Sequence, residues 1–208
     1  MGDSIAPQVG QRGPDFEAIA VINEDFYNLR SADYRGRYLI LLFYPLDFTF
    51  VCPTEIGAFS DRYDEFQALN TDILGISIDS QYAHLAWIQT ERKLGGVGPV
   101  RFPLVSDLKR DISQAYRLLD SQEGVALRGS LILDPEGLIQ QATIHNLAVG
   151  RSVDETLRSL RAIQHVQRHR DEVCPADWQP GQASLTTQPR PGTRASPGPD
   201  PAPENSLP

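Results

Sequence analysis

The stretch at residues 43–55 constrains this chain more than any other part of its sequence, because an apolar run ends there at Pro45 and a cysteine follows directly before a second proline. Proline suits the first turn of a helix, so Pro53 predicts a helix start with Cys52 at its edge. The unpaired N–H groups and partial positive charge of a helix start stabilise an anion such as a thiolate. The pKa of a cysteine in such a setting falls from about 8.5 to about 3.5–7.5. A small buried hydrophobe would suit the same position, and position alone leaves both interpretations open.

Length and charge limit the class of protein. A chain of 208 residues fits one domain of ordinary size with appendages. Its 19 basic and 27 acidic residues give a net charge of -8, which argues against a nucleic-acid partner. Residues 1–12 lack the basic and apolar regions of a signal peptide, and the longest apolar run, at 38–45, is far shorter than the roughly 20 residues that a bilayer requires. We therefore expect a cytoplasmic protein with no membrane partner.

The chain contains two cysteines, Cys52 and Cys174. Two widely separated cysteines make neither a disulfide framework nor a four-cysteine zinc site, and neither belongs to a C-x-x-C pair. In a reducing compartment they are either incidental or redox-active. The loop Gly95-Gly96-Val97-Gly98 lacks the signatures of a phosphate-binding loop, so no nucleotide cofactor is predicted.

The pattern of apolar residues predicts strands that alternate with helices. Two unalternating apolar runs, at 38–44 and 73–78, are typical of strands covered on both faces. Between them, apolar residues recur at spacings of three or four as far as Leu69, which predicts one amphipathic helix from Pro53 onward. Strand, helix and strand in this order favour a parallel pair. The sequence further predicts a strand within 15–22, a turn at 23–25, a helical turn at 31–34, a helix at 81–94, a loop at 95–99, an extended piece at 102–105 and a helix at 108–118.

The second half of the chain adds antiparallel strands. Asp134-Pro135-Glu136-Gly137 has proline at the second position of a turn, so the apolar segments beside it, 130–134 and 138–144, predict a β-hairpin. Ser152 and Glu155 have capping-box spacing and precede an apolar stripe, which predicts a helix at 154–167. We therefore expect a mixed sheet with helices on both faces.

Composition changes after Trp178. Eight of the sixteen prolines lie between Pro180 and Pro208, in a segment with no aromatic residue. Such a segment buries too little apolar surface to offset its ordering entropy, so residues 183–208 are predicted to form a solvated, disordered tail.

These features together closely resemble the typical two-cysteine peroxiredoxins, nearest to their cyanobacterial and plastid branch. The resemblance covers roughly residues 5–182 and is strongest at 43–55 and around Cys174, in Glu172-Val173-Cys174-Pro175-Ala176-Asp177-Trp178. Further matching segments lie at 79–81, 84–88, 95–98, 124–129 and 149–155.

The resemblance implies an α/β protein with a thioredoxin-like fold, in which helices flank a mixed central β-sheet and an extended C-terminal arm follows. It divides the chain into a peroxidase domain at 1–169, an arm carrying the resolving cysteine at 170–182, and the proline-rich tail at 183–208. It implies an enzyme that reduces hydrogen peroxide and organic hydroperoxides, in antioxidant defence, without metal, flavin or haem.

The resemblance also assigns roles to residues. Cys52 matches the peroxidatic cysteine, which attacks the peroxide and becomes a sulfenic acid. Pro45 matches the residue that shields the thiolate, Thr49 the one that hydrogen-bonds the peroxide, and Arg128 the one that stabilises thiolate and developing charge. Glu55 and Arg151 match a supporting pair.

Cys174 matches the resolving cysteine. In this family it comes from the partner subunit, forms an intersubunit disulfide, and is released by a thioredoxin-type dithiol. The resemblance implies an obligate homodimer able to form a ring of five dimers. Because a cysteine in a helix's first turn is not free to reach a partner, the turn around Cys52 is expected to unwind.

Each match has an ordinary structural alternative. Pro45 could simply end a strand, Thr49 could be a turn residue and Arg128 a surface cation, but their joint occurrence in this order favours the enzyme. His84 lies among apolar residues and is expected to be structural or interfacial. The competing hypothesis is a non-enzymatic holdase or redox-relay scaffold that uses the same ring and cysteine pair.

The C-terminal segment departs from the family pattern. Sensitive members carry a C-terminal helix with a Tyr-Phe motif beside the Gly-Gly-x-Gly loop, whereas residues after Pro180 contain no aromatic. We therefore expect comparative resistance to over-oxidation.

Overall fold

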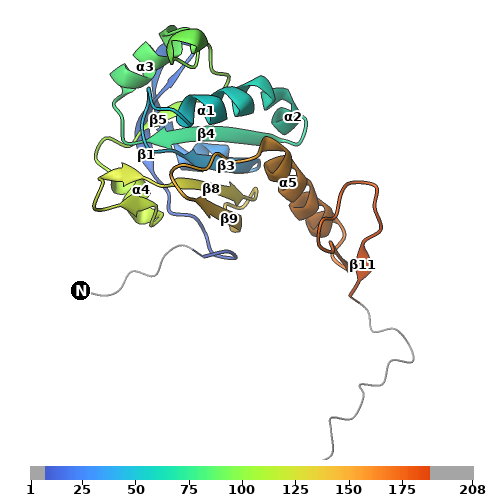
Figure 1. Cartoon of the computed structure of the whole chain (residues 1–208). Coiled ribbons are helices and arrows are strands. Elements are labelled where there is room, and N and C mark those ends of the chain that lie inside the picture. The colour runs from blue at the N-terminus through green and yellow to red at the C-terminus, as the bar shows by residue number, and fades with distance from the viewer. Residues whose placement is uncertain (1–7, 188–208) are drawn as a thin grey trace, which may run out of the picture.

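A computed structural model describes residues 8–187 of the chain (Figure 1). Residues 188–208, which make up most of the predicted tail, lie outside this range. The described elements are β1 (Glu17–Ile22), β2 (Asp25–Arg30), the 3-10 helix η1 (Ser31–Tyr34), β3 (Tyr38–Phe43), α1 (Cys52–Asp61), α2 (Tyr63–Gln67), β4 (Thr71–Ser77), α3 (Gln81–Gln89), the 3-10 helix η2 (Arg92–Leu94), β5 (Leu104–Ser106), α4 (Asp111–Ala115), β6 (Leu119–Asp120), β7 (Val125–Ala126), β8 (Arg128–Leu133), β9 (Ile139–His145), α5 (Val153–Arg168), β10 (Glu172–Val173) and β11 (Leu185–Thr186).

Seven strands form one mixed sheet in the order β2-β1-β5-β4-β3-β8-β9. The pairs β3–β4 and β4–β5 are parallel, and the other pairs are antiparallel. The predicted parallel pair and the predicted hairpin, now β8 and β9, are both confirmed, as is the mixed sheet. β3 lies between β4 and β8, which explains why its sequence is apolar without alternation.

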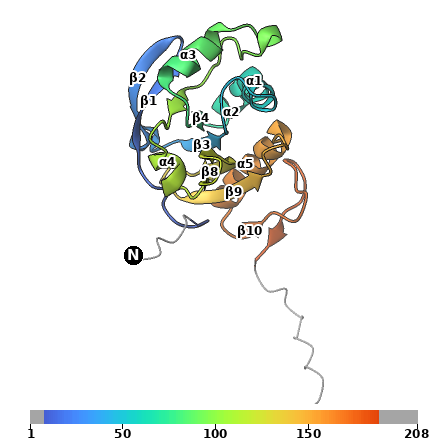
Figure 2. The same ribbon diagram turned by 60° about the vertical axis from the view of Figure 1, so that its left-hand side comes forward.

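Helices cover both faces of the sheet, but unequally (Figures 1 and 2). Ile40 and Leu42 of β3 point into a core that also contains residues of α1, α2, α3 and α5. Leu41 and Phe43 point the other way, into a core shared with α4. Successive residues of a strand face opposite sides, so one apolar run supplies both cores.

The strand β2 was not predicted. A turn at 23–25 was expected, and Asn23 and Glu24 do form it with positive φ, but the chain then returns as an edge strand paired with β1. Nearly all residues of β2 are exposed, so this strand lacks the apolar pattern by which strands are recognised.

The helices predicted at 53–69, 81–94 and 108–118 are shorter in the structure. The first is divided at Arg62 into α1 and α2. α3 ends at Gln89 because the Trp87 carbonyl accepts from Val97 N, at 3.2 Å, and Thr90 turns extended. α4 begins only at Asp111, because Arg110 has a left-handed φ of 63° and the Asp107 carboxylate caps the helix start. The helix at the capping box is confirmed as α5, with Ser152 Oγ accepting from Glu155 N.

The C-terminal arm extends further than predicted. β10 pairs with β11, and Thr187 N donates to Asp171 O at 2.9 Å. Residues 185–187, which lie beyond the predicted boundary at 182, return to pair with the start of the arm. In Figure 1 this arm lies at the C-terminal end of α5.

The fold brings three sequence regions to one end of the sheet. β3 runs into the turn before α1, β8 starts beside that turn, and α5 begins next to both, as the contacts of Arg151 with Phe43 O and Gly129 O show. No helix among residues 8–187 is both long and apolar enough to cross a membrane.

Candidate active site

Cys52 is the first residue of α1 and is fully buried. Val51 precedes it without offering a side-chain cap, and its carbonyl accepts from both Thr54 N and Glu55 N, at 3.1 and 3.2 Å. The thiol therefore lies at a helix N-terminus, as predicted from Pro53, where backbone N–H groups favour an anion.

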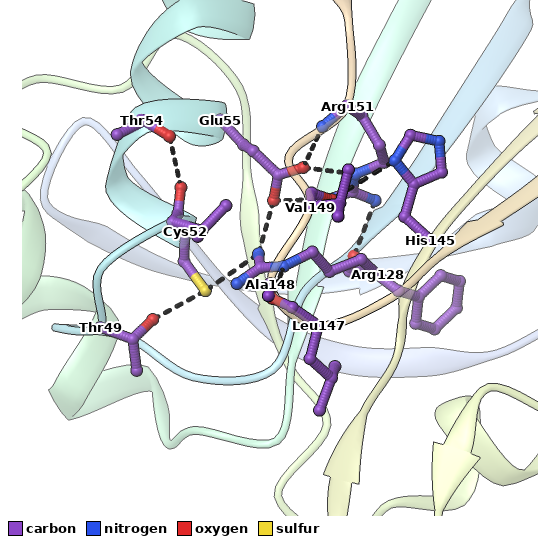
Figure 3. Close-up of polar contacts among 12 residues, drawn as sticks. Thr49, Cys52, Thr54, Glu55, Arg128, His145, Leu147, Ala148, Val149 and Arg151 are labelled. Carbon is purple, nitrogen blue, oxygen red and sulfur yellow. Dashed lines mark hydrogen bonds and ion pairs between the residues drawn. The ribbon is translucent and has the colours of Figure 1, made fainter.

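Two side chains contact the sulfur (Figure 3). The Sγ atom of Cys52 lies 2.8 Å from Thr49 Oγ1 and 3.3 Å from Arg128 Nη1. Thr49 Oγ1 is also 3.0 Å from the Leu46 carbonyl. A hydroxyl has one proton, so Thr49 donates to only one of these acceptors at a time. When the sulfur is a thiolate, it competes with the carbonyl for that proton, so the hydroxyl can reorient as the charge on sulfur changes.

Arg128 is held from two sides. It starts β8, its Nε donates to Leu147 O at 2.6 Å, and its Nη1 donates to Glu55 Oε2 at 2.6 Å. Nη1 carries two protons, so it contacts the carboxylate and the sulfur together. The guanidinium is almost fully buried, so its charge acts on the sulfur with little screening by water.

Glu55 is the buried anion that holds this group together. Arg151 donates to its Oε1 through both backbone N and Nε, at 2.7 Å each, and Nη2 lies 3.0 Å from Oε2. Burial alone would raise the pKa of Glu55, but the hydrogen bonds and charge of Arg151, together with the charge of Arg128, lower it overall. The buried guanidinium groups of Arg128 and Arg151 therefore share the Glu55 carboxylate. A thiolate at Cys52 would be the second negative charge in this group.

A buried network supports the turn that carries Thr49, and the sequence did not reveal it. Asp47 accepts from Tyr44 OH at 2.9 Å and pairs with His84 Nδ1 at 2.8 Å, while its backbone N donates to Asp79 Oδ2 at 2.9 Å. Burial raises the pKa of Asp47, and His84 opposes this shift. His84 is fully buried and serves this support, in line with its predicted structural role. In the sequence, the only hint of this network was the carboxylate of Asp47 between the apolar residues Leu46 and Phe48.

Pro45 is buried in the same turn, between β3 and Thr49. Its role in shielding the sulfur stays a prediction. Of the seven predicted site residues, the hydrogen-bonded group contains Cys52, Thr49, Arg128, Glu55 and Arg151.

Cys174 is not brought to the site within the chain. It follows β10 in the arm, and its Sγ lies 3.8 Å from Ala162 O of α5. At about 1.5 Å per residue, Ala162 is about 14 Å along the axis from the start of α5, the end that lies beside the active site. Partial burial and the charge of Glu172 raise the pKa of the Cys174 thiol, while Arg158 opposes them. On balance, these surroundings disfavour the thiolate form of Cys174.

The site contains one nucleophile, Cys52, and two hydrogen-bond donors beside its sulfur, Thr49 and Arg128. Such donors stabilise negative charge, so the site suits attack on an electrophile whose leaving group is an anionic oxygen. Among residues 8–187, no three His, Cys, Asp or Glu side chains are placed to hold a metal ion.

Comparisons with known proteins agree with this chemistry. Residues 9–142 match the AhpC/TSA family, and residues 162–190 match the C-terminal domain of 1-Cys peroxiredoxin. The chain is 60% identical over 182 residues to a putative peroxiredoxin of Synechocystis, covering 88% of this chain and 91% of that protein. It is 52% identical to a mitochondrial thioredoxin-dependent peroxide reductase of Drosophila melanogaster, covering 88% and 78%.

A solved structure confirms the thioredoxin-like fold. The reduced 2-Cys peroxiredoxin of Plasmodium vivax superposes with a TM-score of 0.82 and 43% identity, covering 85% of this chain and 91% of that one. The higher identity to the cyanobacterial relative than to the animal one also fits the predicted branch. The chain belongs to the AhpC/TSA family, among its two-cysteine peroxiredoxins.

Proposed function

We propose that this chain is a thiol peroxidase that reduces hydrogen peroxide and organic hydroperoxides with Cys52 as nucleophile. One observation carries the proposal: the buried Sγ of Cys52 lies within hydrogen-bond distance of both Thr49 Oγ1 and Arg128 Nη1. Burying a guanidinium costs free energy unless it is paired. A cysteine that only fills space in the core would not require such a group beside its sulfur.

In the first step the thiolate attacks the nearer oxygen of the peroxide. An S–O bond forms, the O–O bond breaks, and the leaving oxygen takes a proton to depart as water or an alcohol. Cys52 becomes a sulfenic acid, oxidised by two electrons, and the peroxide is reduced by two. Negative charge grows on the leaving oxygen, so donors held at the sulfur stabilise the transition state more than the ground state.

Each predicted site residue has a role in this step. Thr49 hydrogen-bonds the peroxide through its hydroxyl group, Arg128 stabilises the thiolate and the departing oxygen, and Pro45 keeps water from the sulfur. Glu55 and Arg151 fix the direction of the Arg128 guanidinium, which is supported by their shared hydrogen bonds.

In the second step Cys174 of another copy condenses with the sulfenic acid, forming a disulfide and releasing water. The separation of Cys174 from the active site along α5 supports transfer between chains, since a disulfide needs Cα atoms about 4.4–6.8 Å apart. The arm at 170–187 then acts as a separate unit from the peroxidase domain at 1–169, and the first turn of α1 unwinds once per cycle.

Exposed apolar side chains around the site support an obligate homodimer. Phe50, two residues before Cys52, is 96% exposed, and Ile144 and Val149 are more than half exposed. Ile144 belongs to β9, an outer strand of the sheet; residues 10–11 pair with its first residue, Ile139, and its later residues offer backbone groups to a second copy. Five such dimers would form the ring that the family resemblance suggests.

A thioredoxin-type dithiol closes the cycle in the cytoplasm. It reduces the intersubunit disulfide to two thiols and becomes oxidised itself. The relative from Drosophila is named as thioredoxin-dependent, which supports this reductant.

The test is peroxide consumption with thioredoxin and its reductase, comparing Cys52→Ser and Cys174→Ser. Both variants are expected to lose turnover, and only Cys174→Ser should still form a trappable sulfenic acid. Mixing the two variants should restore a covalent dimer on non-reducing gels. Peroxide turnover that survives in Cys52→Ser would reject the proposal, and a scaffold protein would give no turnover in the unmodified chain.

A further inference from the structure

Arg92 connects helix α1 to the glycine-rich turn at 95–98. Its Nη1 and Nη2 atoms donate to both carboxylate oxygens of Asp61, at 2.8 and 2.7 Å, and its Nε donates to Val97 O at 3.0 Å. Asp61 is the last residue of α1, the helix that Cys52 begins. One side chain therefore holds the end of this helix and the turn together, and we refer to Arg92, Asp61 and the Val97 carbonyl as the Arg92 clamp.

Arg92 lies beside glycines of both elements. A Cβ atom added at Gly57 of α1 would meet the Arg92 guanidinium carbon at 3.6 Å, and one at Gly98 would meet its Cγ at 3.8 Å. At Gly96 the backbone passes so near Thr90 that a Cβ would lie 1.9 Å from the Thr90 oxygen. The guanidinium therefore packs along the side of α1 as well as pairing with its last residue.

The clamp borders a groove beside the first turn of α1. This groove has a volume of about 380 Å³, and its walls include Pro53 and Thr54 on one side and Arg92 and Gly96 on the other. Figure 2 shows α3, which leads into this turn, next to α1. Since short helices owe most of their stability to tertiary contacts, the clamp contributes to the stability of all of α1, including its first turn.

We propose that Arg92 is a positioning residue that restrains unwinding of the first turn of α1, and so sets how a Cys52 sulfenic acid divides between two fates. The proposal rests on the proposed peroxidase function. While the turn stays folded, a second peroxide can oxidise the sulfenic acid to a sulfinic acid and leave as water or an alcohol. Once the turn unwinds, Cys174 can condense with the sulfenic acid and release water.

The first test is amide hydrogen exchange of the reduced protein, because it requires no turnover. The amides of Thr54 and Glu55 donate to the Val51 carbonyl and report directly on the first turn. In Arg92→Met these two amides should exchange about three- to tenfold faster, the size expected for one bidentate ion pair with an added backbone hydrogen bond. Arg92→Lys keeps the charge but not the fork and should give a smaller change.

Arg101 offers a matched control. It donates to Asp64 through Nη1 at 2.8 Å, and its side chain is 46% exposed, against 49% for Arg92. This pair joins α2 to the segment before β5, so Arg101→Met removes an arginine of similar exposure, with its carboxylate pair, without releasing Val97. Exchange of Thr54 and Glu55 should stay unchanged in this control.

The second test is intact mass after peroxide titration under turnover. Arg92→Met should accumulate sulfinic acid at Cys52 about three- to tenfold less per turnover, while the rate of the first oxidation stays within twofold. Equal amide exchange in Arg92→Met and Arg101→Met, or an unchanged or larger sulfinic fraction, would overturn the clamp. Failure of the unmodified protein to consume peroxide would instead reject the proposed function, and the exchange result would still decide the role of Arg92.

Discussion

Arg128 Nη1 lies 3.3 Å from the Sγ atom of Cys52. The same nitrogen donates to Glu55 at 2.6 Å, and Nε of that guanidinium donates to Leu147 O. Two acceptors on α1 and one on the segment after β9 thus fix one planar group, and a single ammonium cannot reproduce this arrangement.

We therefore predict that Arg128→Met lowers the second-order rate of peroxide reaction at Cys52 by about 10²–10³, the usual cost of losing one such donor. Arg128→Lys should recover only part of this rate. Stopped-flow detection of Cys52 oxidation measures both, with circular dichroism to establish that each variant folds. A rate within threefold of the unmodified protein in Arg128→Met would show that the guanidinium does not take part in the chemistry.

Glu55 predicts a pH-dependent contribution to stability. Its pKa is lowered from the ordinary value of 4.5 in the folded protein, so the charged form favours folding. This contribution is complete above about pH 4.5 and is lost as pH falls below that value through the lower folded pKa. Glu55→Gln should lower the free energy of unfolding by about 3 kcal/mol at pH 7, because it leaves two buried guanidinium groups short of an anion.

Urea unfolding between pH 7 and pH 3.5 measures this difference. The gap between Glu55→Gln and the unmodified protein should narrow below pH 4.5, as the carboxylate of the latter takes up a proton. Asp64→Asn serves as control, since Asp64 is exposed and its pair with Arg101 is screened by water. A gap that is constant across this range would mean that the charge of Glu55 adds nothing to stability.

The elements that were predicted correctly carry strong local signals. β3 and the β8–β9 hairpin have apolar runs with clear turn residues, and α5 has a capping box whose hydrogen bond is present. β2 was missed because an exposed edge strand has no apolar periodicity, and α4 was overestimated because Arg110 adopts a left-handed φ.

The site was predicted only in part for a similar reason. Cys52 and Thr49 lie in one short motif, and the resemblance brought in Arg128. The support of the turn depends on contacts between distant positions, such as His84 with Asp47, 37 residues apart. Asp61 and Arg92 are 31 residues apart, and both look like ordinary surface charges in the sequence. Pairings of this kind depend on tertiary structure and leave no periodic signal in one chain.

The glycines at 95 and 96 are predicted to differ in their tolerance of alanine. Gly95 has φ of 86° with nothing within 4 Å of an added Cβ, so Gly95→Ala should cost only backbone strain, about 1 kcal/mol. Gly96→Ala would place Cβ 1.9 Å from the Thr90 backbone oxygen and must displace the chain, at about 2 kcal/mol or more beyond the first variant. Urea unfolding of the two variants compares them, and equal stability would contradict the close approach of this turn to Thr90.

We predict that two neighbouring charges shift the pKa of the Cys174 thiol in opposite directions. Partial burial and Glu172 raise its pKa above the ordinary value, while Arg158 lowers it. In a Cys52→Ser background, the rate of alkylation by iodoacetamide should therefore rise with pH through a midpoint above that of a free cysteine. Arg158→Met should move this midpoint higher, because it removes the opposing cation.

Glu172→Gln should move the midpoint lower, because the carboxylate no longer repels the thiolate. Glu172 also pairs with His165 and Ser184, so this variant tests charge only if the arm stays packed. Fluorescence of Trp178, which is buried in the arm, monitors that packing. Opposite shifts in the two variants, with unchanged fluorescence, would show that the charges of Glu172 and Arg158 set the pKa of the Cys174 thiol. Shifts in the same direction would mean that arm movement, and not the two charges, sets the reactivity of this thiol.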